Sequence, residues 1–274
     1  MLQRPVAIGL LITLTFASNA AAAPKTAREK SELIGPVRSV VTMAPGTSES
    51  ATYDRTGNLI EAVLYRQYES HSTRYVFTYN QQGALQEERA YDAGDTLIYR
   101  KLFAYAHDPD GRETAVVAAS QDGEFHHVAF SRYDRHGTVS ETIHADRAVT
   151  SRNLFDVLGR LLYSGQYREG QLLGESGRDY DSQGRLIALT SYSPDGTVTG
   201  KVVHEYDDIG KRIRTTTEVL QHGTASRWTT TYEYDGIGNW IKELTKQEPS
   251  ISSTTESARS QMLQERLIDY YDGR

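Results

Sequence analysis

Acidic residues that recur in one short phrase are the first candidates for chemistry in this chain. The phrase reads "YDRTGNLIEA" at 53–62, "YDSQGRLIAL" at 180–189, "YDDIGKRIRT" at 206–215 and "YDGIGNWIKE" at 234–243. Carboxylates repeated at a steady interval could be calcium ligands, because calcium prefers oxygen atoms. An Asp at the first position of a turn has a simpler use, since its side chain accepts hydrogen bonds from the backbone that follows. We interpret the repeated Asp as a turn residue.

Three other groupings resemble functional sites but lack a part that the chemistry requires. In "HDPDG" at 107–111 two acids lie two residues apart, but a calcium loop also needs a third acid and a distant Glu. His126 and His127 are adjacent, and adjacent strand residues point to opposite faces, so one metal ion could not easily bind both. "GESG" at 174–177 is not the G-x-S-x-G of a nucleophile elbow, which also needs a strand followed by a helix. The sequence therefore predicts no catalytic residue, no metal site and no cofactor.

The phrase occurs eight times and marks a long-period repeat. Its glycine advances by 26, 28, 26, 22, 25, 26 and 28 residues from Gly57 to Gly238, and the copy at 105–111 carries two inserted residues. Weaker turn signals lie about half a period away, as in "SPDG" at 193–196, so each half-period leaves a segment of strand length. The structural turn residues predicted in this way are Asp54, Gly57, Gly83, Asp134, Gly137, Asp156, Gly159, Asp181, Gly184, Asp207, Gly210, Asp235 and Gly238.

Each period is thus predicted to be a β-hairpin, and the chain to be an all-β antiparallel meander of repeated hairpins. The motif glycine is expected to take a positive φ and to close the hairpin with a bulge. The Tyr that ends one strand and the apolar residue that opens the next are expected to pack along neighbouring strands and to join the repeats. About 16 to 18 strands are expected, in a long open sheet that twists or curls. The pattern does not determine how far the sheet closes.

With these features the chain resembles the YD-repeat proteins, the Rhs and wall-associated protein families. The resemblance is carried by the repeated Y-D-x-x-G-[RN]-L phrase over roughly residues 50 to 245. It implies a long β-strip that spirals into a shell, and the chain is similar to the small exported members. No activity follows from the family.

The N-terminal segment predicts export. Residues 1–22 combine Arg4, an apolar run and small residues before Pro24, as in a secretory signal peptide, so we expect a periplasmic or secreted protein. The apolar run is too short to span a bilayer, and without cysteine there is no thiol for a lipid anchor. The segments expected after it are a linker at 23–36, the repeat array at 37–245, a polar Ser/Thr-rich loop at 246–261 and a C-terminal capping strand at 262–274. Helix remains an alternative for the last segment, since Met262 and Arg266 have helical spacing.

The charge and the aromatic content of the chain restrict the classes of ligand that we expect the protein to bind. The net charge of −6, with both signs mixed along the chain, gives no basic surface for nucleic acid. Tyr occurs 18 times and Phe 6 times, so the repeats could present rows of rings to a sugar or a peptide. The motif tyrosines are more simply explained as a ladder between repeats. Trp228, outside the phrase, and Trp240, in place of the usual Leu, remain candidates for stacking on a ligand.

Two functions from different classes follow from this. The first is an exported, non-catalytic scaffold or binding module that contacts a glycan or a protein of the cell envelope. The alternative is an enzyme or a toxin-associated accessory protein with its site among residues that break the repeat, such as 105–127 and 245–261.

Overall fold

The computed structural model describes residues 26–67, 71–107, 109, 113–119, 125–133, 139–143, 149–221, 224–248 and 261–271. Within these ranges one short helix, α1 (Ala27–Lys30), precedes eighteen strands. The strands are β1 Val37–Ala44, β2 Thr47–Tyr53, β3 Leu59–Arg66, β4 His71–Tyr79, β5 Leu85–Tyr91, β6 Leu97–His107, β7 Glu113–Ala119, β8 Phe125–Tyr133, β9 Val139–Ile143, β10 Val149–Phe155, β11 Leu161–Arg168, β12 Gln171–Tyr180, β13 Leu186–Tyr192, β14 Val198–Tyr206, β15 Arg212–Gln221, β16 Thr224–Tyr234, β17 Trp240–Gln247 and β18 Gln261–Tyr270. The backbone alone is described for β7, β8, His71, Ile143, Gln221 and Thr224.

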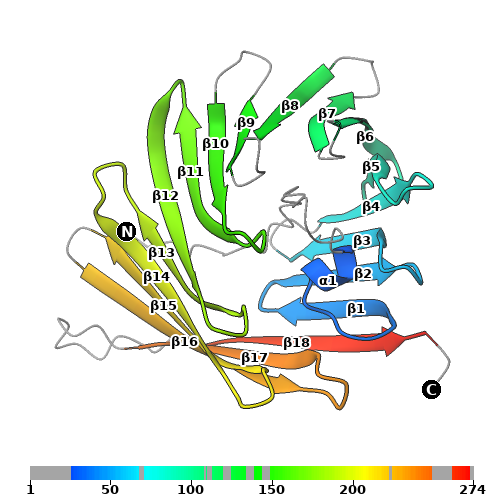
Figure 1. Ribbon diagram of the computed structural model, residues 1–274. Coiled ribbons are helices and arrows are strands. Elements are labelled where there is room, and N and C mark those ends of the chain that lie inside the picture. The colour runs from blue at the N-terminus through cyan, green and yellow to red at the C-terminus, as the bar shows by residue number, and fades with distance from the viewer. Residues whose placement is uncertain are drawn as a thin grey trace, which may run out of the picture.

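Strands that follow one another in the sequence pair with one another, and every pair is antiparallel, which confirms the expected meander of hairpins. In addition, β1 pairs with β18, from Val37 opposite Tyr270 to Met43 opposite Glu265. The two ends of the sheet are therefore joined, and Figure 1 shows the strands following one another around a ring. Each strand of the described sheet thus has two hydrogen-bonded neighbours, which leaves none of these strands as an open edge.

The motif turns share one backbone geometry. Gly184 N donates to Asp181 O at 3.0 Å, and Asp181 N donates to Arg185 O at 3.0 Å. Gly184 has a φ of 81°, and Asp181 Oδ1 accepts from Gln183 N at 2.9 Å and from Arg185 N at 2.8 Å. This is a type I turn closed by a glycine bulge. A positive φ also occurs at Gly57, Gly83, Gly159, Gly210 and Gly238, and side-chain acceptance also occurs at Asp54, Asp156, Asp207 and Asp235. Asp134 and Gly137 lie outside the described residues.

The motif tyrosines connect neighbouring repeats through one recurring hydrogen bond. Tyr206 Oη donates to Leu186 O at 2.8 Å, and Tyr180 Oη donates to Leu161 O at 2.9 Å. In each case the acceptor opens the strand that follows the preceding motif turn. The same bond joins Tyr79 to Leu59, Tyr105 to Leu85 and Tyr234 to Arg212. Each of these tyrosines therefore ties its repeat to the one before it.

The basic residue after the motif glycine links its own turn to the next repeat. Arg185 Nε donates to Asp181 Oδ2 at 2.6 Å, while its guanidinium lies 4.7 Å from the ring centroid of Tyr206. Arg160 lies over Tyr180 in the same way, at 4.9 Å. Burial raises the pKa of the Asp181 carboxyl, but hydrogen bonds from the backbone and side chain of Arg185 outweigh burial and lower the pKa overall. In the repeats with turns at Asp156 and Asp181, the motif thus combines a turn, a hydrogen bond and a cation–π contact.

Residues 26–36, expected as a linker, begin with helix α1. Glu29 N donates to Thr26 Oγ1 at 3.2 Å and Thr26 N donates to Glu29 Oε2 at 2.8 Å, which is a capping box. Arg28 N then donates to Gly57 O at 3.0 Å, so the helix is attached to the motif turn between β2 and β3.

Asn239, beside the motif turn between β16 and β17, holds the other end of this segment. The Asn239 side chain is fully buried, its Nδ2 donates to Ile34 O at 2.9 Å and its Oδ1 accepts from Ile34 N at 2.6 Å. Glu32 adds an ion pair to Arg212 of β15 at 2.8 Å. Residues 26–36 therefore bridge two motif turns that lie on either side of the β1–β18 pair.

The apolar core lies against β1 to β5. In a closed ring, side chains that point inward are covered by those of other strands, so the large buried apolar cluster marks the inner face. The buried cluster consists of Leu33, Val37, Val40, Ala51, Tyr53, Leu59, Ala62, Phe77 and Leu85. Leu33 belongs to the segment after α1, so this segment contributes to the core as well as to the attachment of the ring ends.

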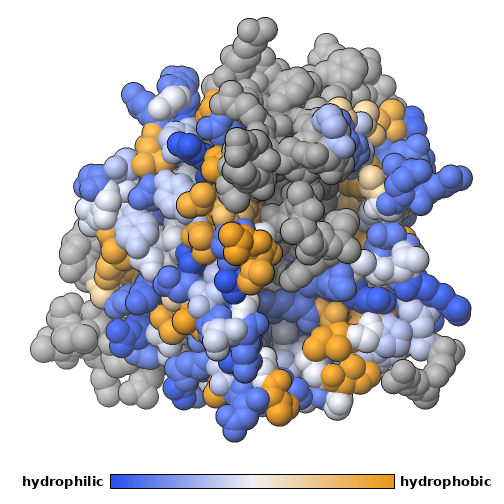
Figure 2. All heavy atoms as spheres, in the orientation of Figure 1, coloured by the Kyte–Doolittle hydropathy of each residue, from blue (hydrophilic) through white to orange (hydrophobic). Residues whose placement is uncertain are grey.

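Apolar residues that remain exposed occur at motif turns, along strands and in the N-terminal segment. Val157 and Leu158, at the tip of the β10–β11 turn, are 91% and 66% exposed. Figure 2 shows hydrophobic residues in several separate areas of the face that it draws. Scattered exposure of this kind is normal for a protein surface. None of the described residues belongs to a helix with the length and apolarity that crossing a membrane requires.

Candidate functional site

The register of the strands identifies the inner face of β10 to β13, because cross-strand partners share a face of the sheet. From Val40 in the apolar cluster, paired residues can be followed around the ring as far as Asn153 on β10. Consecutive pairs either share a residue or are linked by residues two or four positions apart on one strand, which also share a face. The pairs are Val40–Ile268, Gln264–Glu243, Glu243–Tyr232, Thr230–Thr215, Thr217–Val202, Val202–Leu189, Ser191–Ser176, Ser176–Ser164 and Ser164–Asn153.

One row of this inner face consists of small polar side chains, and we refer to it as the serine row. It contains Ser140, Asn153, Ser164, Ser176 and Ser191, which lie opposite one another on β9 to β13. Paired strands lie about 4.8 Å apart, so the row presents a hydroxyl or amide group at that interval. From β10 to β13 the row extends over about 14 Å.

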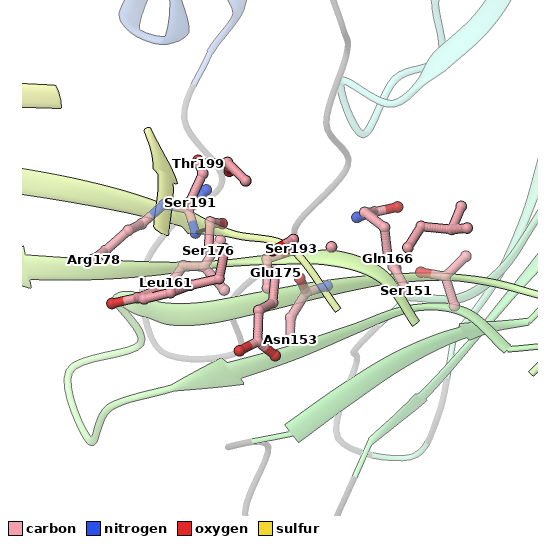
Figure 3. A pocket seen from close by; sticks show the side chains of 15 residues that line it. Ser151, Asn153, Leu161, Gln166, Glu175, Ser176, Arg178, Ser191, Ser193 and Thr199 are labelled. Atoms are coloured by element: carbon pink, nitrogen blue, oxygen red, sulfur yellow. Dashed lines mark hydrogen bonds between the residues drawn. The ribbon is translucent and has the colours of Figure 1, made fainter. Parts of the chain in front are cut away.

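The serine row borders a cavity of about 750 Å³ between β9 and β14 (Figure 3). Thr142, Ser151 and Gln166 line the cavity on one side, and Arg178 lines it on the other. Most of the lining side chains carry a hydroxyl or an amide group, and such groups both donate and accept hydrogen bonds. The wall can therefore form many hydrogen bonds with a polar ligand that carries hydroxyl groups.

Arg178 of β12 supplies a positive charge to this wall. It lies on the inner face, two residues from Ser176, and its Nη1 donates to Ser176 Oγ at 3.4 Å (Figure 3). Burial lowers the pKa of the Arg178 guanidinium, and the opposing influence of Tyr180 is smaller. No carboxylate of the described residues lies within ion-pair distance of Arg178. The guanidinium is thus half-buried without a charged partner in this part of the chain.

Glu175 also borders the cavity, but its carboxylate has a different partner. Successive strand residues point to opposite faces, so Glu175 points outward where Ser176 points inward. Tyr163 Oη donates to Glu175 Oε2 at 2.5 Å, and this hydrogen bond raises the pKa of Tyr163. Figure 3 shows Glu175 and Arg178 extending in different directions. Glu175 therefore does not neutralise the charge of Arg178.

Trp228 of β16 lies on the inner face, half-buried, opposite Thr217 of β15 and Gln247 of β17. No ring–ring or cation–π contact to Trp228 is recorded among the described residues. Trp228 and Arg178 occupy the same inner row four strands apart, which corresponds to about 19 Å. The Trp228 ring therefore lies on the same inner wall as the cavity, beyond the end of the cavity that β14 borders.

Trp240 is placed differently, and the expectation that it could stack on a ligand needs correction. Its side chain is 7% exposed, and the Arg266 guanidinium lies 3.4 Å from its ring centroid. Trp240 thus contributes to packing at the β17–β18 side of the ring, because its ring face is already covered.

Arg266 is half-buried and lies near the half-buried carboxylates of Glu49 and Glu243. Burial lowers the pKa of Arg266 to about 10, and burial raises the pKa of Glu49 and of Glu243. Nε and Nη1 of Arg266 are buried without a hydrogen-bond partner within the described residues. Glu32 of the N-terminal segment acts electrostatically on Arg266 and Glu243. This cluster is therefore part of the contact between residues 26–36 and the ring.

The other sequence candidates do not form a reactive grouping within the described residues. His204 Nδ1 lies 2.9 Å from Thr215 Oγ1, and burial lowers the pKa of His204. In the parts of the chain that the structure describes, no three His, Asp or Glu residues are placed to hold a metal ion. Asp108, Asp110 and the side chains of His126 and His127 lie outside the described residues.

The serine row includes Ser176, for which the sequence suggests only a comparison with a nucleophile elbow. Ser176 of "GESG" lies in the interior of β12, opposite Ser164 and Ser191. The signal that could have revealed the row is a serine or asparagine at each cross-strand position, but recognising it requires the register of four hairpins.

Comparisons with known proteins give distant structural matches. No protein-family model matches the sequence, and no curated protein matches it. The TcdB2-TccC3-Cdc42 structure has 11% sequence identity and a TM-score of 0.26, over 83% of this chain and 16% of that chain. TcdB2-TccC3 without its hypervariable C-terminal region has 13% identity and a TM-score of 0.25, with the same shares of the two chains. A porin-like protein from Bacteroides uniformis has 10% identity and a TM-score of 0.33, over 86% of this chain and 99% of that chain. The chain thus spans about one sixth of the length of the TcdB2-TccC3 chains, and TM-scores this low do not establish a shared fold.

Proposed function

We propose that this protein is an exported, non-catalytic binding module of the YD-repeat type, and that its inner wall from β9 to β14 binds a glycan chain of the cell envelope. The observation that supports this most is the serine row beside the cavity of about 750 Å³. Ligand sites usually combine a concave surface with a few well-placed polar groups, and this wall has both.

A sugar chain fits the row because the polar groups repeat at the strand spacing. Ser164, Ser176 and Ser191 offer hydroxyl groups about 4.8 Å apart, and a chain of sugar rings offers hydroxyl groups along its whole length. Trp228 supports the same reading, since an aromatic ring can pack against the apolar face of a sugar ring. A ligand that crosses the strands could thus contact the serine row and then the indole.

Ser191 and Thr190 provide a matched test of this site. They are adjacent on β13 and point to opposite faces, with Ser191 in the serine row and Thr190 opposite Gly177 on the outer face. Ser191→Val removes a cavity hydroxyl and should weaken glycan binding about fivefold, whereas Thr190→Val should leave binding unchanged. Ser176→Leu should abolish binding, because it replaces a hydroxyl in the middle of the row with a larger apolar side chain.

Wild-type protein and the three variants would be applied to an array of purified envelope oligosaccharides, with thermal melts to show that each is folded. The proposal would be refuted if the wild type retained no glycan, or if Ser176→Leu bound as tightly as Thr190→Val.

Export is the second part of the proposal, and the layout of residues 1–22 supports it. Removal of this segment should give a mature chain that begins near Ala23. Intact-mass measurement of protein from the envelope fraction checks this, and a chain that retains Met1 in the cytoplasmic fraction would contradict it.

A further inference from the structure

Arg178 is a half-buried cation without an anionic partner among the described residues, and it faces a wall of neutral polar groups. Its recorded hydrogen bond, to Ser176 Oγ, is long at 3.4 Å, and this leaves other guanidinium N–H groups free to bind a ligand. The nearest acid along the strand, Asp179, points to the opposite face, and Glu175 is engaged by Tyr163. Taking a charge out of water without a partner is unfavourable, and the lowered pKa of Arg178 has this cause.

We propose that Arg178 makes the cavity selective for an acidic sugar chain, by binding a carboxylate or sulfate group on one of its rings. This inference rests on the proposed function and names the ligand class for the same site. A guanidinium presents parallel N–H groups that match the two oxygens of a carboxylate or a sulfate, so the contact can be bidentate.

The surroundings of Arg178 agree with this assignment. Ser176 lies beside the guanidinium, and Ser191 lies opposite Ser176 on the neighbouring strand. Their hydroxyl groups can bind the sugar hydroxyls next to the acidic group while Arg178 binds its charge. The rest of the row, toward Asn153, is neutral, so an acidic group would be favoured at one end of the bound chain.

The net charge of the protein opposes the binding of an anionic ligand. The chain carries −6, which on its own repels an anionic ligand. A preference for an acidic chain must therefore come from a local positive group, and Arg178 is the cation in the lining of the described cavity.

The test compares pairs of sugar chains that differ only in charge. Oligogalacturonate and its methyl ester form the carboxylate pair, and κ-carrageenan oligosaccharides before and after desulfation form the sulfate pair. Affinities of the mature wild type, Arg178→Gln and Arg178→Lys would be measured by calorimetry at two salt concentrations. Lys201→Gln is the matched control, because Lys201 is an exposed cation on the outer face of β14, opposite Thr190.

The wild type should bind the charged member of one pair at least about tenfold more tightly than its neutral partner. Arg178→Gln should remove this preference, so that it binds the charged and the neutral chain with about equal affinity, while Arg178→Lys should keep part of the preference and Lys201→Gln all of it. The pair that shows the preference identifies the anion as carboxylate or sulfate.

Equal wild-type affinity for charged and neutral chains would overturn this inference but leave the proposed function standing. Persistence of the preference in Arg178→Gln would do the same. If none of the four chains bound to folded wild-type protein, this inference would fail, whereas failure of the proposed function requires that the envelope oligosaccharides do not bind either.

Discussion

Substituting Tyr206 tests whether the recurring tyrosine bond holds the repeats together. Tyr206→Phe keeps the ring but removes the hydrogen bond to Leu186 O, which should lower the free energy of unfolding by about 1 kcal/mol. Tyr206→Ala also removes a half-buried ring and its cation–π contact with Arg185. Complete burial of such a ring corresponds to about 3–5 kcal/mol, so the loss for this variant should be about 3 kcal/mol.

Equilibrium unfolding in urea measures both losses, and Tyr65→Phe is the control. Tyr65 is 44% exposed, and no hydrogen bond to its hydroxyl is recorded among the described residues, so this variant should unfold like the wild type. For a chain of this size each kcal/mol lowers the Tm by about 2–4 °C, which places Tyr206→Phe clearly below the control. If Tyr206→Phe and Tyr65→Phe had the same midpoint, the tyrosine bond would not contribute to stability.

Three further predictions concern the turns, the N-terminal segment and a titrating carboxylate. Gly184→Ala should lower the free energy of unfolding by about 1 kcal/mol or more, because Gly184 has a φ of 81°, whereas Gln183→Ala should have little effect; equal urea midpoints would contradict the turn geometry. Asn239→Leu removes the two hydrogen bonds between the buried Asn239 side chain and the N–H and C=O of Ile34, so it should cost about 1–3 kcal/mol and speed hydrogen exchange at the Ile34 amide; unchanged exchange would show that Asn239 does not hold this segment. Hydrogen bonds from Ser193 and Thr197 lower the pKa of Asp195 to about 2, below the unfolded value of about 3.9. The contribution of the Asp195 carboxylate to the stability of the folded protein should therefore be present above pH 4 and be lost as the pH falls to about 2. Asp195→Asn should show less loss of stability than the wild type across this range in acid titrations followed by circular dichroism, and parallel curves would contradict the assignment.

The repeat predicts the hairpins well because each turn is a local structure. Asp181 and Gly184 determine a turn with neighbours no more than four residues away, so the order of strands follows from the phrase alone. The hydrogen-bond acceptor of the motif tyrosine is harder to predict from the sequence than the turn. Tyr206 and Leu186 are 20 residues apart, and the acceptor is a backbone carbonyl. Spacing shows that the tyrosine recurs but does not show what its hydroxyl binds.

The joining of β1 to β18 depends on contacts that no local pattern encodes. Val37 pairs with Tyr270, and Asn239 binds Ile34 across 205 residues of sequence. The capping box of Thr26 and Glu29 is visible in the sequence, but it starts a helix of only four residues inside an expected linker. The sequence predicts the pieces at both ends of the meander without showing that they meet.

The serine row could not be read from the sequence because bulges change the alternation of faces. The register shifts between Asp179 and Tyr180 on β12 and again between Ser191 and Tyr192 on β13. Counting alternate residues through a hairpin therefore assigns the wrong face to the next strand. Trp228, which was visible as an aromatic residue outside the motif, could be placed on the inner wall only after the pairing was known.

A crystal structure of the mature protein with oligogalacturonate bound would show whether the inner wall of β9 to β14 is the binding site. Electron density for sugar rings is expected along Ser164, Ser176 and Ser191, with a carboxylate group at the Arg178 guanidinium. Sugar density on the outer face of the ring, with none along the serine row, would contradict it.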